Sequence, residues 1–454
     1  MYFIYSLLLA FGFLLLLPRF LFDAARHGKY AAGFRERTGR VPHVRAGAPV
    51  IWLHCVSVGE TQAARPLVRA LLNAFPSHKL VVSTTTLTGQ KVAREVFGQT
   101  AALVFYFPFD WAWSVRRALR AVNPAVVLVM ETELWPRFFR ECRARGVPVA
   151  LVNGRLSEKS FRRYRLVRSF IRRVLSDLSL AVMQSPEDAG RVRALGLASE
   201  RIKVSGNVKF DAESSTVETA LTDELRARFS FDEERPLIVA ASTHAPEERI
   251  LLEAFKLLGD ARPTLHPRLL IAPRHPERFG EVASLLEASG LAWARRSSAM
   301  RDEDARADVV LLDSIGELRA VYPLAGIVFV GGSIARTGGH NVLEPASAAR
   351  CIVTGAQTWN FTAVVRAMRE RDALVQLPDV DEEEAARLLA DVLANYLTDD
   401  ARRRALGARA RAALEENRGA TARTVETLAP LLRTQIREHD GRALTQTERL
   451  PSLF

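Results

Sequence analysis

The chain has 454 residues, of which 48% are hydrophobic and 25% are charged, and this composition excludes an intrinsically disordered protein. Its length allows two or three domains, and its net charge of +12, mostly from arginine, suits an anionic membrane, an anionic substrate or nucleic acid. Three cysteines, Cys55, Cys142 and Cys351, are too few and too scattered for a disulfide framework or a metal cluster, and they indicate a reducing compartment.

The N-terminus is an uncharged apolar segment. Residues 1–18 are rich in Leu, Phe, Ile and Tyr, and the run extends past Arg19 to Phe22. No Lys or Arg precedes it and no small-residue cleavage site follows it, which disfavours a cleaved signal peptide. Arginines and a lysine follow, and by the positive-inside rule they keep the downstream chain in the cytoplasm. The sequence therefore predicts a single-pass transmembrane helix that anchors a cytoplasmic body.

From residue 50 onwards, short apolar runs alternate with helical patterns, which is typical of βαβ units in a parallel sheet covered on both faces. In the first half these runs lie at residues 50–56, 80–83, 103–107, 126–130, 147–152 and 178–183. A polar stretch at 211–224 suits a linker, and the runs resume at 237–241, 269–271, 309–312, 327–330 and 352–354. The pattern predicts an α/β fold with two doubly wound, Rossmann-like domains that face a ligand cleft. The predicted parts are an anchor (1–22), an N-terminal domain (23–212), a C-terminal domain (213–425) and a helical tail (426–454).

Acidic residues follow two predicted strands of the first half. Glu60 follows the first strand in WLHCVSVGE, and Glu131 and Glu133 follow the fourth in VLVMETELWP. A carboxylate at a strand end is often only a helix cap, but one in a partly dry cleft can act as a general base toward a hydroxyl group. Lys209, in GNVKFD, is expected between the two domains.

In a basic stretch at residues 155–173, the arginines at 162, 163, 165, 168, 172 and 173 interleave with Phe161, Tyr164, Leu166 and Phe170. A solvated basic helix and an interfacial helix at anionic head groups both fit this pattern. The same composition suits RNA, but the chain carries no nucleic-acid-binding signature and a hydrophobic N-terminus is unusual for such a protein. We therefore predict membrane lipids, and no nucleic acid, among its partners.

The second half carries strand ends that suit a nucleotide. Residues 273–274 follow one predicted strand, residues 315–317 follow another, and a glycine-rich loop at 331–340 precedes a helix with Asn341 as its predicted N-cap. A loop and a helix N-terminus offer unpaired N–H groups and a favourable dipole to an anion. The loop has neither the Walker A lysine nor the GxGxxG spacing, which disfavours a P-loop NTPase and an ordinary dehydrogenase. An ordinary glycine-rich βα turn remains an open interpretation.

These segments together resemble a known family. WLHCVSVGE, METELWP, GNVKFD, APRHPER, IGEL and GGHNVLEPA, in this order after an N-terminal apolar helix, resemble the 3-deoxy-D-manno-octulosonic acid (Kdo) transferases, membrane-anchored glycosyltransferases of the GT-B fold. The resemblance runs to about residue 420. It implies lipopolysaccharide biosynthesis at the cell inner membrane, with transfer of Kdo from CMP-Kdo to the lipid A precursor lipid IV-A and inversion at the anomeric carbon.

The resemblance also implies roles for particular residues. Glu60 is the implied general base, and Glu131 and Lys209 are implied to support the transition state. The residues implied to bind CMP are Pro273, Arg274, Ile315, Gly316, Glu317, Asn341, Val342, Leu343 and Glu344.

No metal or other cofactor is expected. CMP leaves as a single phosphate, which needs less neutralisation than the pyrophosphate leaving groups that many glycosyltransferases stabilise with a divalent ion. Two Asp-x-Asp matches, at 302–304 and 379–381, lie away from the strand ends discussed above and are interpreted as surface. Two alternative functions stay open: a GT-B transferase that uses a UDP-sugar on a lipid acceptor, and a non-enzymatic, membrane-tethered basic scaffold.

Overall fold

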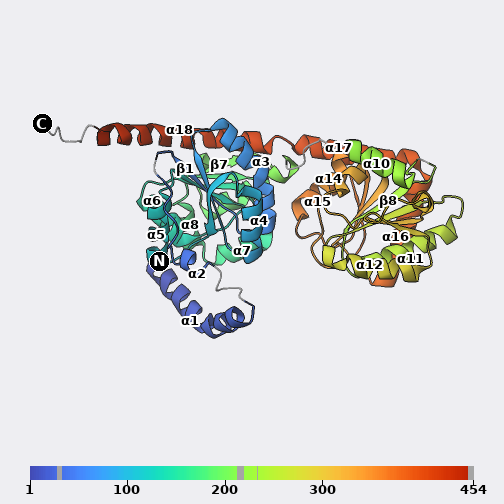
Figure 1. The fold of residues 1–454 in the computed structure, drawn as a ribbon. Coiled ribbons are helices and arrows are strands. Elements are labelled where there is room, and N and C mark those ends of the chain that lie inside the picture. Colours follow the sequence, from blue (N-terminus) through green and yellow to red (C-terminus); the bar gives the residue numbers. More distant parts are fainter. Residues whose placement is uncertain (28–32, 46, 212–218, 233, 448–454) are drawn as a thin grey trace. The chain divides into compact units, whose positions relative to one another are not determined.

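The computed structural model describes residues 1–27, 33–45, 47–211, 219–232 and 234–447, and it describes side chains within 1–18, 33–45, 47–211, 219–232 and 234–433 (Figure 1). Contacts divide the chain into two compact units. Unit 1 comprises residues 1–212 and 418–454, and unit 2 comprises residues 213–417. The C-terminal segment therefore groups with unit 1 from residue 418 onwards, whereas the sequence suggested a second domain that continues to residue 425.

Unit 1 is built on a seven-stranded parallel sheet with the order β3-β2-β1-β4-β5-β6-β7. Its strands are β1 (Val50–His54), β2 (Lys79–Thr84), β3 (Ala101–Tyr106), β4 (Val126–Met130), β5 (Val149–Gly154), β6 (Leu180–Met183) and β7 (Ile202–Val204). The strand order reverses between β1 and β4, and ligands of doubly wound sheets bind outside the carboxyl ends of the strands at such a point.

Helices cover both faces of this sheet. They are α2 (Phe34–Arg37), α3 (Val58–Ala74), α4 (Leu87–Phe97), α5 (Ala112–Val122), α6 (Pro136–Ala144), α7 (Glu158–Leu166), α8 (Arg168–Leu175), α9 (Pro186–Leu195) and α18 (Ala420–Thr447), with 3-10 turns η1 (Ser199–Arg201) and η2 (Val208–Asp211). Alternate residues of β1 belong to two separate cores: Trp52 packs with Phe105 and Phe138 on one face, and Leu53 packs on the other. Because both faces are buried, the strands read as continuous apolar runs.

Helix α18 packs on unit 1 as part of its core. Leu428 and Leu432 are fully buried in the same cluster as Leu53, and α18 contacts α3 and η2. At its start the carboxylate of Asp211 accepts the N–H groups of Gly419 at 2.7 Å and Thr421 at 2.6 Å. These contacts explain why the chain joins unit 1 again at residue 418.

Unit 2 contains a second seven-stranded parallel sheet, with the order β10-β11-β9-β8-β12-β13-β14. Its strands are β8 (Leu237–Thr243), β9 (Arg268–Pro273), β10 (Trp293–Arg295), β11 (Val309–Leu311), β12 (Ala325–Val330), β13 (Cys351–Thr354) and β14 (Val375–Gln376). Its helices are α10 (Thr219–Phe229), α11 (Glu247–Ala261), α12 (Phe279–Ser289), α13 (Leu318–Val321), α14 (Leu343–Ser347), α15 (Thr362–Arg369), α16 (Glu382–Thr398) and α17 (Asp400–Asn417), with 3-10 turns η3 (Pro276–Arg278), η4 (Asp302–Arg306) and η5 (Tyr322–Leu324). Here the order reverses between β8 and β12.

All eleven apolar runs expected from the sequence coincide with strands, within a few residues at their ends. The sequence missed β7, β10 and β14, which have two or three residues each and lie at sheet edges. Short edge strands are half exposed and carry too few apolar residues to form a recognisable run. Of the predicted linker at 211–224, residues 212–218 lie outside the described residues and residues from Thr219 onwards form α10.

The N-terminal apolar segment forms helix α1 (Tyr2–His27), and one side of it packs on the rest of unit 1. The hydroxyl group of Tyr2 donates to Asp177, and that of Tyr5 donates to Asp110 at 2.9 Å. Phe13 packs edge-on against Trp111, with ring centroids 5.2 Å apart. The large apolar side chains that α1 exposes are Phe3, Ile4, Leu7, Leu8, Phe11, Leu14, Leu15 and Leu16. Within the described part of the chain no helix combines the length and apolarity needed to cross a membrane, so the predicted anchor is not confirmed.

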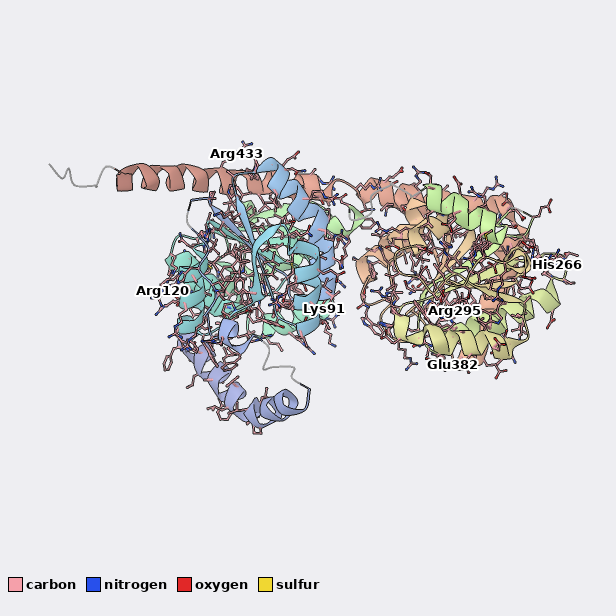
Figure 2. The ribbon with its side chains drawn as sticks, in the orientation of Figure 1. Lys91, Arg120, His266, Arg295, Glu382 and Arg433 are labelled. Atoms are coloured by element: carbon pink, nitrogen blue, oxygen red, sulfur yellow. The ribbon has the colours of Figure 1, made fainter. Side chains whose placement is uncertain are left out.

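The basic stretch at 155–173 forms two helices, α7 and α8, which meet at Val167. Ile171, Val174 and Leu175 face the core, whereas Leu166 is 86% exposed. Many charged and polar side chains elsewhere lie at the surface. Examples labelled in Figure 2 are Lys91 and Arg120 of unit 1 and His266 and Glu382 of unit 2, which are exposed.

Candidate functional site

Glu60 lies at the reversal point of the unit 1 sheet, in the first turn of α3 after β1. One carboxylate oxygen, Oε2, accepts the N–H of Val56 at 2.8 Å, and the other, Oε1, accepts the hydroxyl group of Ser57 at 3.0 Å. Ser57 is the N-cap of α3, and its Oγ accepts the N–H of Glu60 in return. This reciprocal arrangement satisfies the helix start and fixes the position of the carboxyl group.

The environment of Glu60 favours its protonated form. The residue is only 7% exposed, and burial, followed by the negative charges of Glu131 and Glu133, raises its pKa to about 8. The two hydrogen bonds described above oppose this rise. A carboxyl group whose pKa is tuned close to the working pH is suited to proton transfer.

Glu131 and Lys209 form an ion pair in unit 1, with Lys209 Nζ 3.2 Å from Glu131 Oε1. Glu131 follows β4, the neighbour of β1, and its backbone has φ 54°. Lys209 lies in η2, where the N–H of Val208 donates at 3.1 Å to Oδ1 of Asn153, near the end of β5. The structure therefore places the three residues implied to be catalytic at one edge of one sheet. The ion pair between Glu131 and Lys209 joins two segments that are 78 residues apart in the sequence.

The residues implied to bind CMP come from three loops at the carboxyl ends of the unit 2 strands. Arg274 follows β9, and its backbone N–H donates to the carbonyl of Thr243, the last residue of β8. Glu344 in α14 lies 3.7 Å from Arg319, which follows the 315–317 segment. Ile315 is 81% exposed and Gly316 has open space around it, so this loop offers an apolar surface. In contrast, Pro273, Val342 and Leu343 are buried, which leaves their backbone groups as the contacts they offer.

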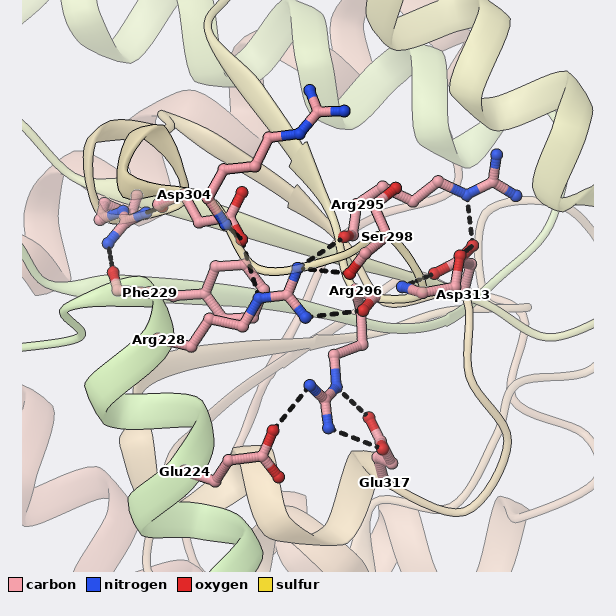
Figure 3. A network of polar contacts seen from close by, with 12 residues as sticks. Glu224, Arg228, Phe229, Arg295, Arg296, Ser298, Asp304, Asp313 and Glu317 are labelled. Atoms are coloured by element: carbon pink, nitrogen blue, oxygen red, sulfur yellow. Dashed lines mark hydrogen bonds and ion pairs between the residues drawn. The ribbon is translucent and has the colours of Figure 1, made fainter.

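Glu317 is held by its own protein partners. Arg296 forms a bidentate ion pair with it at 2.8 and 3.1 Å and also pairs with Glu224 (Figure 3). Next to this pair, Arg228 binds Asp304 at 2.8 Å and three backbone carbonyls. The interpretation of residues 302–304 as surface is therefore wrong for Asp304, which is buried because it balances the charge of a buried arginine.

The glycine-rich loop already holds an anion, the carboxylate of Glu247. This side chain, in the first turn of α11, is fully buried. It accepts the N–H groups of Gly332 at 2.8 Å, Ser333 at 2.9 Å, Ile334 at 2.8 Å, Ala335 at 3.2 Å and His244 at 3.0 Å. Burial raises the pKa of Glu247 and these donors oppose the rise. The first part of the loop is therefore not the open anion pocket that the sequence suggested.

Asn341 also differs from the expectation. The helix α14 begins at Leu343, and Val342 is its N-cap. Asn341 lies one residue before the cap, and its Oδ1 accepts the N–H of Leu343 at 3.1 Å. Its amide group also contacts Glu344 at 3.4 Å.

Sequence reasoning missed a histidine pair at the reversal point of the unit 2 sheet. His244 follows β8, His340 follows β12, and their Nε2 atoms lie 2.8 Å apart. The only available signal was that each histidine follows a predicted strand. Among the described residues, no group of three or more His, Cys, Asp or Glu side chains could hold a metal ion.

Comparisons with known proteins bear on the family and the fold. Residues 32–212 match a family model described as 3-deoxy-D-manno-octulosonic-acid transferase (kdotransferase). The 3-deoxy-D-manno-octulosonic acid transferase of Haemophilus influenzae is 34% identical over 409 residues, which cover 90% of this chain and 93% of that protein. That of Bordetella pertussis is also 34% identical, over 90% of this chain and 91% of that protein. The structure of UDP-GlcNAc 2-epimerase from Neisseria meningitidis is similar in fold, with a TM-score of 0.54, 12% identity, and coverage of 85% of this chain and 100% of that one.

Proposed function

Because this chain belongs to the 3-deoxy-D-manno-octulosonic acid (Kdo) transferase family, we propose that it moves Kdo from CMP-Kdo to lipid IV-A with inversion at the anomeric carbon. It is a glycosyltransferase of lipopolysaccharide biosynthesis. The observation that carries the finer proposal is the gathering of Glu60, Glu131 and Lys209 at the reversal point of the unit 1 sheet.

In this mechanism Glu60 takes the proton of the acceptor hydroxyl group, and that oxygen attacks the anomeric carbon of Kdo as the bond to the phosphate breaks. The raised pKa of Glu60 suits a base that must compete for an alcohol proton. The Lys209 ammonium group neutralises Glu131, and the pair then presents fixed charges to the oxocarbenium-like centre. The electron pair of the broken bond goes to CMP, which we propose is bound by the Arg274, Ile315–Glu317 and Asn341–Glu344 segments of unit 2, without a metal ion.

The reaction is tested by mass spectrometry of lipid IV-A incubated with CMP-Kdo and the purified full chain. A mass increase by one or more Kdo residues is the expected product. A preference for a UDP-sugar over CMP-Kdo would support the alternative transferase. Binding of both substrates without turnover, unchanged when Glu60 is replaced, would support the scaffold.

Arg274→Ala is expected to weaken CMP binding by about 1.5–3 kcal/mol, the contribution of a charge-assisted hydrogen bond. Arg274 is exposed at the end of β9 and has no carboxylate partner among the described residues, so it is free to pair with a phosphate. Calorimetry with CMP measures the change. Arg262→Ala is the matched control, because its guanidinium donates to the adjacent carbonyl of Ala261 and has no carboxylate partner within the described part of the chain. Equal CMP affinity in both variants would place the phosphate elsewhere.

Glu344 should act differently from Arg274, because a carboxylate repels phosphate and suits ribose hydroxyl groups. Glu344→Gln keeps an acceptor oxygen near Asn341, whereas Glu344→Ala removes it and leaves Arg319 without this partner. We expect calorimetry to show a smaller loss of CMP affinity for the glutamine variant. The reverse order would exclude a ribose contact.

We propose further that α1 attaches the protein to the cell inner membrane, with the body on the cytoplasmic side. Support comes from the apolar side of α1 that is not covered by unit 1, where Phe3, Leu7 and Phe11 recur at intervals of one turn and are 60–76% exposed. The exposed arginines of α7 and α8 would add attraction to anionic lipids.

Leu7→Asp combined with Phe11→Asp is expected to weaken binding to lipid vesicles at least about tenfold, because two large apolar side chains would no longer enter the bilayer. Stability should change little, since neither side chain is buried. Flotation of the full chain with vesicles measures binding, and Leu257→Asp on unit 2 is the control. Undiminished flotation of the double variant would mean that this side of α1 does not contact lipid.

A further inference from the structure

The His244–His340 pair lies where a doubly wound sheet places its ligand. β8 and β12 are neighbours at the reversal point of the unit 2 sheet, and one histidine follows each of them. Residues proposed to bind CMP lie next to both histidines. Asn341 follows His340 in the sequence, and Arg274 follows β9, the strand beside β8.

Both histidines are held firmly in place. The backbone N–H of His244 donates to Glu247, whose carboxylate also binds the loop after β12. The backbone N–H of His340 donates to the Gly331 carbonyl at 3.1 Å. A Cβ at Gly332 would lie 2.8 Å from the His340 ring, so glycine is required there for the ring to reach His244. The two rings lie 4° from parallel.

The hydrogen bond between the rings limits their protonation. Two nitrogen atoms 2.8 Å apart must share one proton, because two N–H groups facing each other would repel. The pair is neutral when neither ring is protonated on both of its nitrogen atoms, and burial and the neighbouring positive charges favour that form. Burial, followed by the charges of His244 and Arg274, lowers the pKa of His340 to about 3, and burial together with His275 lowers that of His244.

The surrounding charges lack a counter-ion. Glu247 is saturated by backbone N–H groups, and Glu248 pairs with Arg278 at 2.6 and 3.2 Å and accepts the Thr243 hydroxyl group. The ring of His275 lies 5.0 Å from that of His244, edge to face. Arg274 remains without a carboxylate among the described residues, and its charge acts on both members of the pair. The positive charge of Arg274 is therefore not balanced by a carboxylate of the described residues.

We propose that the His244–His340 pair is a proton-linked part of the phosphate site: when the phosphate of the nucleotide binds beside Arg274, the bond between the two Nε2 atoms opens, the pair takes up one proton from solvent, and the resulting imidazolium donates to a phosphate oxygen. This rests on the proposed binding of CMP by unit 2. During transfer the bond from Kdo to the phosphate oxygen breaks, its electron pair stays on that oxygen, and the imidazolium stabilises the added negative charge.

Proton uptake makes binding depend on pH in a definite direction. The free pair carries one proton fewer than the bound pair, so CMP affinity rises as pH falls, by up to about tenfold per pH unit by linkage. The range from pH 8 to 6.5 is suitable, because the second phosphate pKa of a monoester lies near 6.

The test is calorimetry of CMP binding to the full chain at pH 7.5 in two buffers with different ionisation enthalpies. The wild-type chain should take up a proton on binding CMP and none on binding cytidine, which lacks the phosphate. In His244→Gln and in His340→Gln the uptake should fall toward zero and the affinity should lose its pH dependence. Exposed His43→Gln is the matched control, and thermal unfolding checks each fold. If one of these variants is unstable, the other carries the test, because both histidines are only partly buried.

The outcomes separate this inference from the function on which it rests. CMP binding with the same proton uptake in both glutamine variants overturns the role of the pair and leaves the proposed function standing. Uptake that accompanies cytidine as well as CMP overturns the assignment to phosphate. Absence of CMP binding by the wild-type chain overturns the nucleotide specificity of unit 2 and the phosphate site together.

Discussion

Glu60→Gln is expected to lower kcat by roughly 10²–10⁴-fold while it leaves CMP affinity nearly unchanged. Glutamine keeps the size of the side chain and can still accept from Val56, but it cannot take a proton from an alcohol. The segments proposed to bind CMP belong to unit 2, whereas Glu60 belongs to unit 1. The affinity for CMP should therefore be the same in the variant and the wild-type chain. Single-turnover kinetics with CMP-Kdo and calorimetry with CMP separate the two effects.

Glu133→Gln is the matched control, because Glu133 is a second partly buried acid that follows the same strand as Glu131 and has a raised pKa. It makes no proposed contact with the reacting atoms, so kcat should change only a few fold. Near-normal turnover of the Glu60 variant would remove this residue from the mechanism. An equal loss in both variants would mean that the negative charge of the region, and not the base, is what matters.

The pH dependence of the wild-type enzyme should report the same group. With a pKa of about 8, Glu60 is mostly protonated at pH 7 and must ionise to act as base, so kcat at saturating CMP-Kdo should rise with pH and level off above 8. We choose kcat because kcat/KM would also contain the opposite pH dependence proposed for nucleotide binding. Because Glu133 contributes to the raised pKa, Glu133→Gln should move this rise to lower pH. The raised value also means that the stability contributed by this carboxyl group is present below pH 4.5 and lost as pH rises through 8. A profile that falls between pH 6 and 8 would contradict the assignment.

The sequence was sufficient for the features that depend on local patterns. Continuous apolar runs predicted the central strands of both sheets, since strands buried on two faces have no polar side. The polar residues that follow such runs then had to lie at the carboxyl edge of a parallel sheet. Glu60 and Glu131 are close because β1 and β4 are neighbours, and that strand order was the one step the runs did not contain.

Features that depend on distant partners could not be read from the sequence. Tyr2 and Tyr5 sit in an apolar run that resembles a membrane span, but their hydroxyl groups bind buried acids more than 100 residues away. The glycine-rich loop predicted an open pocket for an anion, but its position after β12 gave no indication that a carboxylate of the protein itself occupies the first part of the loop. Glu247 looks like an ordinary acid in a first helical turn until β8 is placed beside β12.

Glu247→Ala is expected to produce the largest loss of stability in unit 2, at least about 3 kcal/mol. Each buried N–H group left without an acceptor costs roughly 1–3 kcal/mol, and Glu247 serves five of them, although water entering the vacated space would satisfy some. For a unit of this size, 3 kcal/mol corresponds to a decrease in Tm of roughly 6–12 °C. Thermal and denaturant unfolding of the full chain measure it.

Glu253→Ala is the control, because Glu253 lies on the same helix and no contact of its side chain is described. Glu247→Gln should also destabilise the unit, because the amide NH₂ would face N–H donors where a carboxylate oxygen accepted them. Glu247 also matters for function, because it binds the backbone N–H of His244 and the loop that carries His340. Both Glu247 variants should therefore displace the two histidines and weaken CMP binding. A Tm within about 1 °C of the Glu253 control would show that the loop holds its shape without this carboxylate, and the first part of it would then be available to a phosphate after all.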